Sequence, residues 1–197
     1  MEQTKRVPVI RAVTPDNLAP DALDGFVRTQ TVTQVYRRIG GEYRLVERPF
    51  VDDWSAARKR EKAAELRSGD YTAFGAWDGP RIVGFIALEK ALRGDRLVVS
   101  GLHVSREYRG SGHGRRLFRL GLEEGRRLGS RALYISACSA RETVGFYRAM
   151  GCLPAEPVIA SLAEAEPYDL QLVCPVAWEA GELSGFSQIL RKDILLT

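Results

Sequence analysis

The stretch "RLVVSGLHVSREYRGSGHGRRLF", residues 96–118, decides the fold. Residues 97–104 form an almost continuous apolar run, which is typical of a strand buried on both faces of a sheet. Glycines then stand at three alternate positions, Gly110, Gly112 and Gly114. The following residues place leucines near helical spacing and end at Gly129, so they predict a helix. The segment therefore predicts a strand, a glycine turn and a helix in succession.

The glycine turn has the chemistry of an anion site. The first amides of a helix have no partner within the helix and carry a partial positive charge, which suits phosphate oxygens. Glycine lets these amides approach a ligand closely, and Arg109 and Arg115 could add charge-assisted contacts. A Walker loop is excluded because Gly114 is not followed by Lys-Ser/Thr, and the spacing is not that of a dinucleotide fold. A merely flexible turn remains the alternative.

The other segments predict a mixed α/β architecture. Strands are expected at 7–14, 131–138 and 168–174, hairpins at 30–50 around Gly40-Gly41 and at 71–91, and helices at 14–27, 52–67 and 140–151. Residues 175–197 give no clear pattern. Hairpins followed by a strand–helix–strand–helix order indicate an α/β domain with a mixed sheet.

Length and composition place narrow bounds on the class of protein. The 197 residues suit one domain, 1–197, with a substantial core. The net charge of +4 is spread along the chain, so no nucleic-acid partner is expected. No apolar stretch of about 20 residues predicts a membrane span, and no signal peptide is visible. The cysteine count of 3, without CxxC spacing, argues against disulfides and zinc, so a cytoplasmic location is expected.

Two linked motifs resemble those of the GNAT superfamily of N-acetyltransferases. Arg109-Gly110-Ser111-Gly112-His113-Gly114 matches the pattern Arg/Gln-x-x-Gly-x-Gly/Ala of that family's cofactor turn. The second signature appears in "GFYRAMGC", with Phe146 and Tyr147, after an intervening strand at the expected place. The resemblance covers roughly residues 70–175. It implies a GNAT-like domain, with a mostly antiparallel sheet, helices on both faces and a splayed central pair of parallel strands.

The resemblance also implies acetyl-CoA as cosubstrate, without a metal. By position, Leu102, His103 and Val104 would hold the pantetheine arm through their backbone, and Tyr147 would protonate the departing thiolate. The diphosphate would be held by the turn, through Arg109, Gly110, Ser111, Gly112, His113, Gly114 and Arg115. Two departures from the family pattern, Ala140 in place of Asn and Cys152 in place of an aromatic residue, affect contacts to the arm.

Attack of an amine on a thioester needs two proton transfers. The amine must lose a proton before or during attack, and the sulfur must gain one. Glu89, at the end of an apolar strand, is the candidate base, although a solvent-facing charge at a strand end is an equally ordinary interpretation. His103 alternates with its neighbours and could face the acceptor. His113 is expected to pack or face solvent, and Cys138 to pack rather than act as a nucleophile.

The acceptor is expected to be the primary amine of a small molecule. The 30–50 hairpin could close over the cleft as a lid or form a homodimer contact. The acidic stretch with Glu164, Glu166 and Asp169 either attracts a cationic amine or is an ordinary surface loop. Two alternatives remain open: a protein acetyltransferase acting on an N-terminus or a lysine, and a non-catalytic module that binds acetyl-CoA.

Overall fold

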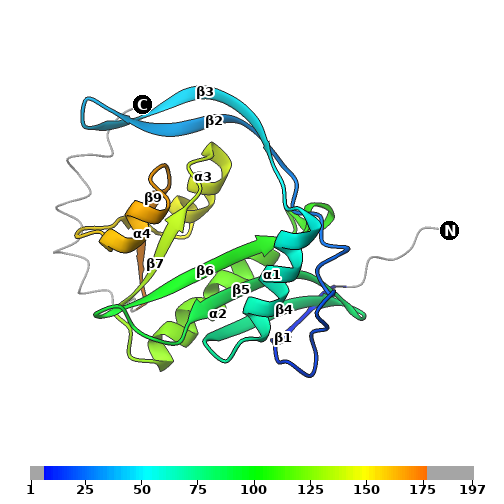
Figure 1. Cartoon of the computed structure of the whole chain (residues 1–197). Coiled ribbons are helices and arrows are strands. Elements are labelled where there is room, and N and C mark those ends of the chain that lie inside the picture. The colour runs from blue at the N-terminus through cyan, green and yellow to red at the C-terminus, as the bar shows by residue number, and fades with distance from the viewer. Residues whose placement is uncertain (1–6, 177–197) are drawn as a thin grey trace.

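The computed structural model describes residues 7–176, which are built around one twisted sheet (Figure 1). Its seven strands lie in the order β1-β4-β5-β6-β7-β9-β8, and a second, two-stranded sheet forms a separate arm. The strands of the main sheet are β1 (Val9–Ala12), β4 (Tyr71–Asp78), β5 (Arg81–Glu89), β6 (Arg96–Val104), β7 (Ala132–Ala137), β8 (Leu153–Pro154) and β9 (Leu170–Pro175). The arm consists of β2 (Gln30–Ile39) and β3 (Glu42–Asp52).

Helices cover both faces of the main sheet. One face carries α2 (His113–Arg127) and α3 (Arg141–Ala149), which share a buried cluster with β5, β6, β7 and β9. The other face carries α1 (Ala56–Arg67) over β4 and β5, and α4 (Ala160–Ala165) over β7 and β9. The fold predicted from the sequence is therefore confirmed. Within residues 7–176, no helix is long and apolar enough to cross a membrane.

The central strands part from each other halfway along their length. All neighbours in the main sheet are antiparallel except β6 and β7, which pair in parallel only from Arg96 to Val98. The register of β6 against β5 shifts between Gly101 and Val99, so Ser100 is the extra residue of a β-bulge. A bulge bends and twists its strand. The remaining part of β6, up to Val104, consequently has an open edge on the β7 side.

Two expectations for the regular elements need correction. Residues 14–27 are a series of turns rather than a helix, because Pro20 interrupts the helical hydrogen bonding and the Asn17 side chain binds the backbone at Thr14 and Ala12. Leu18, Leu23 and Phe26 are nonetheless buried in the core. The short α4 and β8 were not expected. The unassigned tail, apart from its first residues, lies outside the described residues.

The other predicted elements are confirmed with shifted ends. The helix expected over 52–67 begins at Ala56, because β3 extends to Asp52 and Ser55 caps the helix by accepting a hydrogen bond from the Arg58 amide. Gly40 and Gly41, both with positive φ, turn the arm hairpin as expected. The extent of the domain over 1–197 stays a prediction.

Candidate active site

The glycine turn presents a row of free amides. Gly110 and Gly112 have φ values of 78° and 81°, in the left-handed region that favours glycine, and Gly112 is the N-cap of α2. Within the described residues 7–176, the amides of residues 110–115 donate no hydrogen bond. A Cβ at either glycine would meet nothing within 4 Å. The turn therefore offers several donors and the partial positive charge of a 15-residue helix to an anion.

The side chains around this turn have different roles. The Arg109 guanidinium donates to the carbonyl oxygens of Val104, Thr29 and Arg28 at 2.9, 2.9 and 2.7 Å, so it fastens the N-terminal segment to the end of β6. The Arg115 side chain is exposed. The His113 imidazole is buried beneath the turn, and burial lowers its pKa. Of these three residues, Arg115 alone has a cationic side chain that is free to meet a phosphate at the surface.

Leu102, His103 and Val104 lie on the splayed part of β6, where the strand has an open edge toward β7. Leu102 and Val104 pack against the cluster shared with α2 and α3. His103 points to the opposite face, where its ring centroid lies 4.6 Å from that of Trp54. Burial, with the positive charges of Arg28 and Lys62, lowers the pKa of His103 well below its usual range. His103 is therefore neutral, and its ring lies on the face of the sheet that carries α1.

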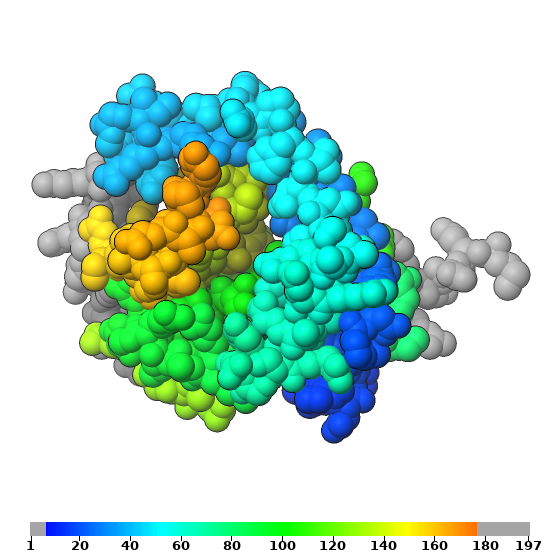
Figure 2. All heavy atoms as spheres, viewed as in Figure 1, coloured from blue at the N-terminus to red at the C-terminus, as the bar shows by residue number. Residues whose placement is uncertain are grey.

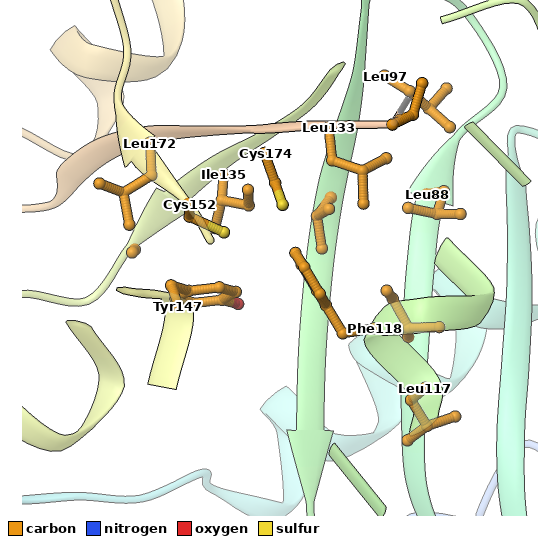
Figure 3. Packing of buried hydrophobic residues seen from close by; sticks show 14 of the residues in the cluster. Leu88, Leu97, Leu117, Phe118, Leu133, Ile135, Tyr147, Cys152, Leu172 and Cys174 are labelled. Carbon is orange, nitrogen blue, oxygen red and sulfur yellow. The ribbon is translucent and has the colours of Figure 1, made fainter. Parts of the chain in front are cut away.

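Tyr147 lies on α3 at the edge of the main core (Figure 3). Its ring makes edge-on contacts with Phe118 at 5.8 Å and Phe146 at 5.2 Å, which fix its position. The side chain is 6% exposed and lines the cleft described below, and its hydroxyl makes no hydrogen bond within residues 7–176. Burial raises the pKa of Tyr147, so the phenol is protonated and is available as a proton donor.

A cleft of about 460 Å³ opens where β6 and β7 part. Figure 2 shows the hollow between α1 and the segment containing α4, with the arm above it. Its floor is formed by β6 and β7, and its walls come from α1, α3 and α4. Its lining includes Arg28, Gln30, Trp54, Arg58, Lys62, Glu89, Ser100, Leu102, His103, Val104, Arg109, Ser136, Cys138, Thr143, Tyr147, Leu162, Glu166 and Asp169. Leu102, His103 and Val104 of β6 and Tyr147 of α3 thus border the same space.

The β2–β3 arm passes above α3, β7 and β9 in Figure 1 and lies above the hollow in Figure 2, and it is fastened at its far side. The Tyr36 amide donates to the Ser139 carbonyl at 2.8 Å, and Val35 forms a bridge with Ala140. The Arg37 guanidinium donates to the Ser139 hydroxyl at 2.5 Å and lies 4.9 Å from the centre of the Tyr168 ring. At the near end, Arg28 pairs with Asp52 at 2.6 Å. The arm consequently connects both walls of the cleft.

The carboxylates of the cleft differ in their partners. Glu89 accepts two hydrogen bonds from Arg93, at 3.0 and 3.3 Å, so its charge is largely compensated. Among residues 7–176, Glu166 and Asp169 form no salt bridge, and both line the cleft, whereas Glu164 does not. The structure therefore brings two carboxylates of the predicted acidic stretch to the cleft.

Several cleft residues were missed from the sequence. Trp54 and Lys62 belong to no recognisable sequence motif. They line the cleft because α1 packs against the sheet beside β6, which the sequence does not reveal. Ser100 is the extra residue of the β6 bulge and lines the cleft, and its hydroxyl donates a hydrogen bond to Glu65 of α1. Cys138 lines the cleft, and burial raises the pKa of its thiol, which fits a packing role. No group of three potential metal ligands occurs within the described part of the chain.

Comparisons with known proteins agree with this geometry. The model of the acetyltransferase (GNAT) family matches residues 41–152. The fold is similar to that of a nourseothricin acetyltransferase, with a TM-score of 0.66 and 21% identity over 87% of this chain and 100% of that one. A candidate streptothricin acetyltransferase from Bacillus anthracis, solved with acetyl coenzyme A, gives a TM-score of 0.63 and 14% identity over 85% and 96%.

A third similar fold belongs to an enzyme that modifies a protein. The ribosomal-protein-S18-alanine N-acetyltransferase of Escherichia coli has a TM-score of 0.53 and 15% identity, over 89% of this chain and 97% of that one. No curated protein sequence matches the chain. The family model covers more than half of the 197 residues and includes the glycine turn and Tyr147. The chain thus belongs to the acetyltransferase (GNAT) family and is an acetyl-CoA-dependent acyltransferase.

Proposed function

We propose that the enzyme transfers the acetyl group of acetyl-CoA to the primary amine of a small molecule, by direct attack within a ternary complex. The observation that carries this proposal is the position of Tyr147. Tyr147 lines a cleft that also contains the open edge of β6, and its hydroxyl is free of hydrogen bonds among the described residues. An acid placed between a cofactor strand and an acceptor space suits a transfer reaction better than binding alone.

Each part of the site has one role in this proposal. The amides of residues 110–115 hold the diphosphate of the cosubstrate, with Arg115 beside them and Arg109 holding the turn in place. The open edge of β6 over Leu102–Val104 binds the pantetheine amides, and a backbone N–H there stabilises the charge that develops on the thioester oxygen. The Tyr147 hydroxyl then donates its proton to the departing sulfur.

The arm favours a small acceptor over a protein. A protein substrate needs an open groove in which an extended peptide can lie, and here the arm bridges the cleft from Asp52 to Ser139. The 460 Å³ volume suits a compact ligand. Two of the proteins with similar folds, the nourseothricin enzyme and the candidate streptothricin enzyme, are named after antibiotic substrates.

We also propose that the enzyme works in the cytoplasm. The three cysteines are free, which accords with a reducing compartment.

A CoA-release assay with a panel of amines tests this proposal. The panel contains a polyamine, an aminoglycoside, a streptothricin, a peptide with a free N-terminus and a lysine peptide, and calorimetry measures CoA binding in parallel. We expect release with at least one of the small amines and little with the peptides. Faster release with a peptide would favour a protein acetyltransferase. CoA binding without release for any amine would indicate a binding module.

A further inference from the structure

Among the described residues, the cleft contains one carboxylate that is partly buried and forms no salt bridge, that of Asp169. Asp169 lies directly before β9, and its amide donates to the Glu166 carbonyl at 3.0 Å, which holds it at the end of a tight turn. It is partly buried and forms no salt bridge within residues 7–176, whereas Glu89 is paired with Arg93. It lines the same cleft as Tyr147. The cleft therefore places a proton acceptor and a proton donor around one space.

We propose that Asp169 is the general base that removes a proton from the acceptor ammonium group. This assignment rests on the function proposed above. The Asp169 carboxylate takes one proton from R–NH3+, and the neutral nitrogen forms a C–N bond with the thioester carbonyl carbon. The C–S bond breaks, and the sulfur takes its proton from Tyr147. The second proton of the nitrogen restores the Tyr147 phenol, and Asp169 releases its own proton to solvent.

The surroundings of Asp169 favour this role. Burial, together with the negative charges of Glu166 and Asp52, raises the pKa of Asp169 to about 6, against the opposing effects of the Ser136 hydroxyl and the Arg37 charge. Cys138 and Tyr147 line the same cleft and are neutral at pH 7, since burial and the charge of Asp169 raise their pKa values. A carboxylate with a raised pKa is a stronger base than an ordinary aspartate and is still mostly ionised at pH 7.

The value of kcat/KM should rise with pH, because only the ionised form of Asp169 can accept a proton. Asp169 accepts a proton only above its pKa, so kcat/KM rises with pH through about 6 and then levels off. Removal of the neighbouring negative charge by Glu166→Gln lowers the pKa of Asp169, because that charge raises it. The rising part of the profile of this variant therefore moves to lower pH.

The test compares pH profiles of kcat and kcat/KM for four forms of the full chain, with the best amine from the panel. For Asp169→Asn we expect a loss of about 100-fold or more in kcat at pH 7, the range of general base catalysis. Its remaining rate should rise about tenfold per pH unit, because only amine already neutral in solution reacts. The profile of Glu166→Gln should shift to lower pH relative to wild type, and this shift, not the size of kcat, is the readout for that variant. Glu164→Gln is the matched control outside the cleft and should behave as wild type.

The outcomes separate this proposal from the proposed function. The CoA affinity from calorimetry and the melting temperature show whether Asp169→Asn is folded. If this variant is not folded, the shift of the pH profile in Glu166→Gln decides whether Asp169 is the base. Wild-type kcat in folded Asp169→Asn, or an unshifted profile in Glu166→Gln, would overturn the assignment and leave the proposed function intact. A wild-type enzyme that acetylates no amine would overturn both.

Discussion

Replacement of Gly112 by valine should weaken CoA binding sharply. Gly112 has a φ of 81° and is the N-cap of α2, and an L-residue pays about 1–2 kcal/mol in this left-handed conformation. If the chain relaxes to negative φ, the following amides no longer converge. Each charge-assisted hydrogen bond is worth about 1.5–3 kcal/mol, so the loss of two corresponds to a Kd about 100-fold higher or more. Isothermal titration of CoA measures this change.

Gly79→Val is the matched control for this experiment. Gly79 turns the β4–β5 hairpin with a φ of 58°, and a Cβ there also meets nothing within 4 Å, as at Gly112. Its substitution carries a similar conformational cost at a turn that does not line the cleft. We expect both variants to lose stability in thermal unfolding and Gly112→Val alone to lose CoA affinity. A wild-type Kd for Gly112→Val would refute the reasoning.

Three further predictions follow from the same contacts. Tyr147→Phe should lower kcat at least tenfold with CoA affinity and stability nearly unchanged, because the hydroxyl has no partner within residues 7–176; equal turnover in the assay would remove it from the mechanism. Arg37→Ala removes two of the contacts that fasten the arm, while the Tyr36–Ser139 hydrogen bond and the Val35–Ala140 bridge remain. It should raise KM for the acceptor severalfold in steady-state kinetics with CoA affinity unaltered, and an unchanged KM would show that these contacts do not shape the acceptor site. Gly121→Ala should lower the free energy of unfolding measured in urea, since a Cβ there comes within 2.6 Å of Ile86. Gly145→Ala, where a Cβ meets nothing within 4 Å, should raise the free energy of unfolding by about 0.5–1 kcal/mol. The reverse order of the two variants would contradict the packing.

The parts of the fold that the sequence predicted depend on local signals. The apolar run of β6, the glycines of the turn and the leucines of α2 are close together in the chain, and each carries its own periodicity or conformational requirement. The arm hairpin was predictable for the same reason, because Gly40 and Gly41 supply the positive φ of its turn. Residues 14–27 were mispredicted because a helix-start signal outweighed the effect of Pro20 inside the segment.

The parts of the site that escaped prediction depend on long-range contacts. That Arg109 contacts phosphate stays a prediction, and the contacts of its guanidinium with the carbonyls of residues 28 and 29, far away in the chain, were not foreseen. The role of Glu89 as a base stays a prediction; its salt bridge with Arg93, four residues away, is a local contact of the β5–β6 turn. Asp169 lies in a stretch that reads equally well as a surface loop. Its setting depends on β3, β7 and α4 meeting at one place.

The most direct test of the central claim is a crystal structure of the enzyme with coenzyme A. We predict that the diphosphate oxygens lie within hydrogen-bonding distance of the amides of residues 110–115, and that the pantetheine arm runs along the open edge of β6 toward Tyr147. A structure with the diphosphate bound elsewhere and these amides facing only solvent would contradict the account.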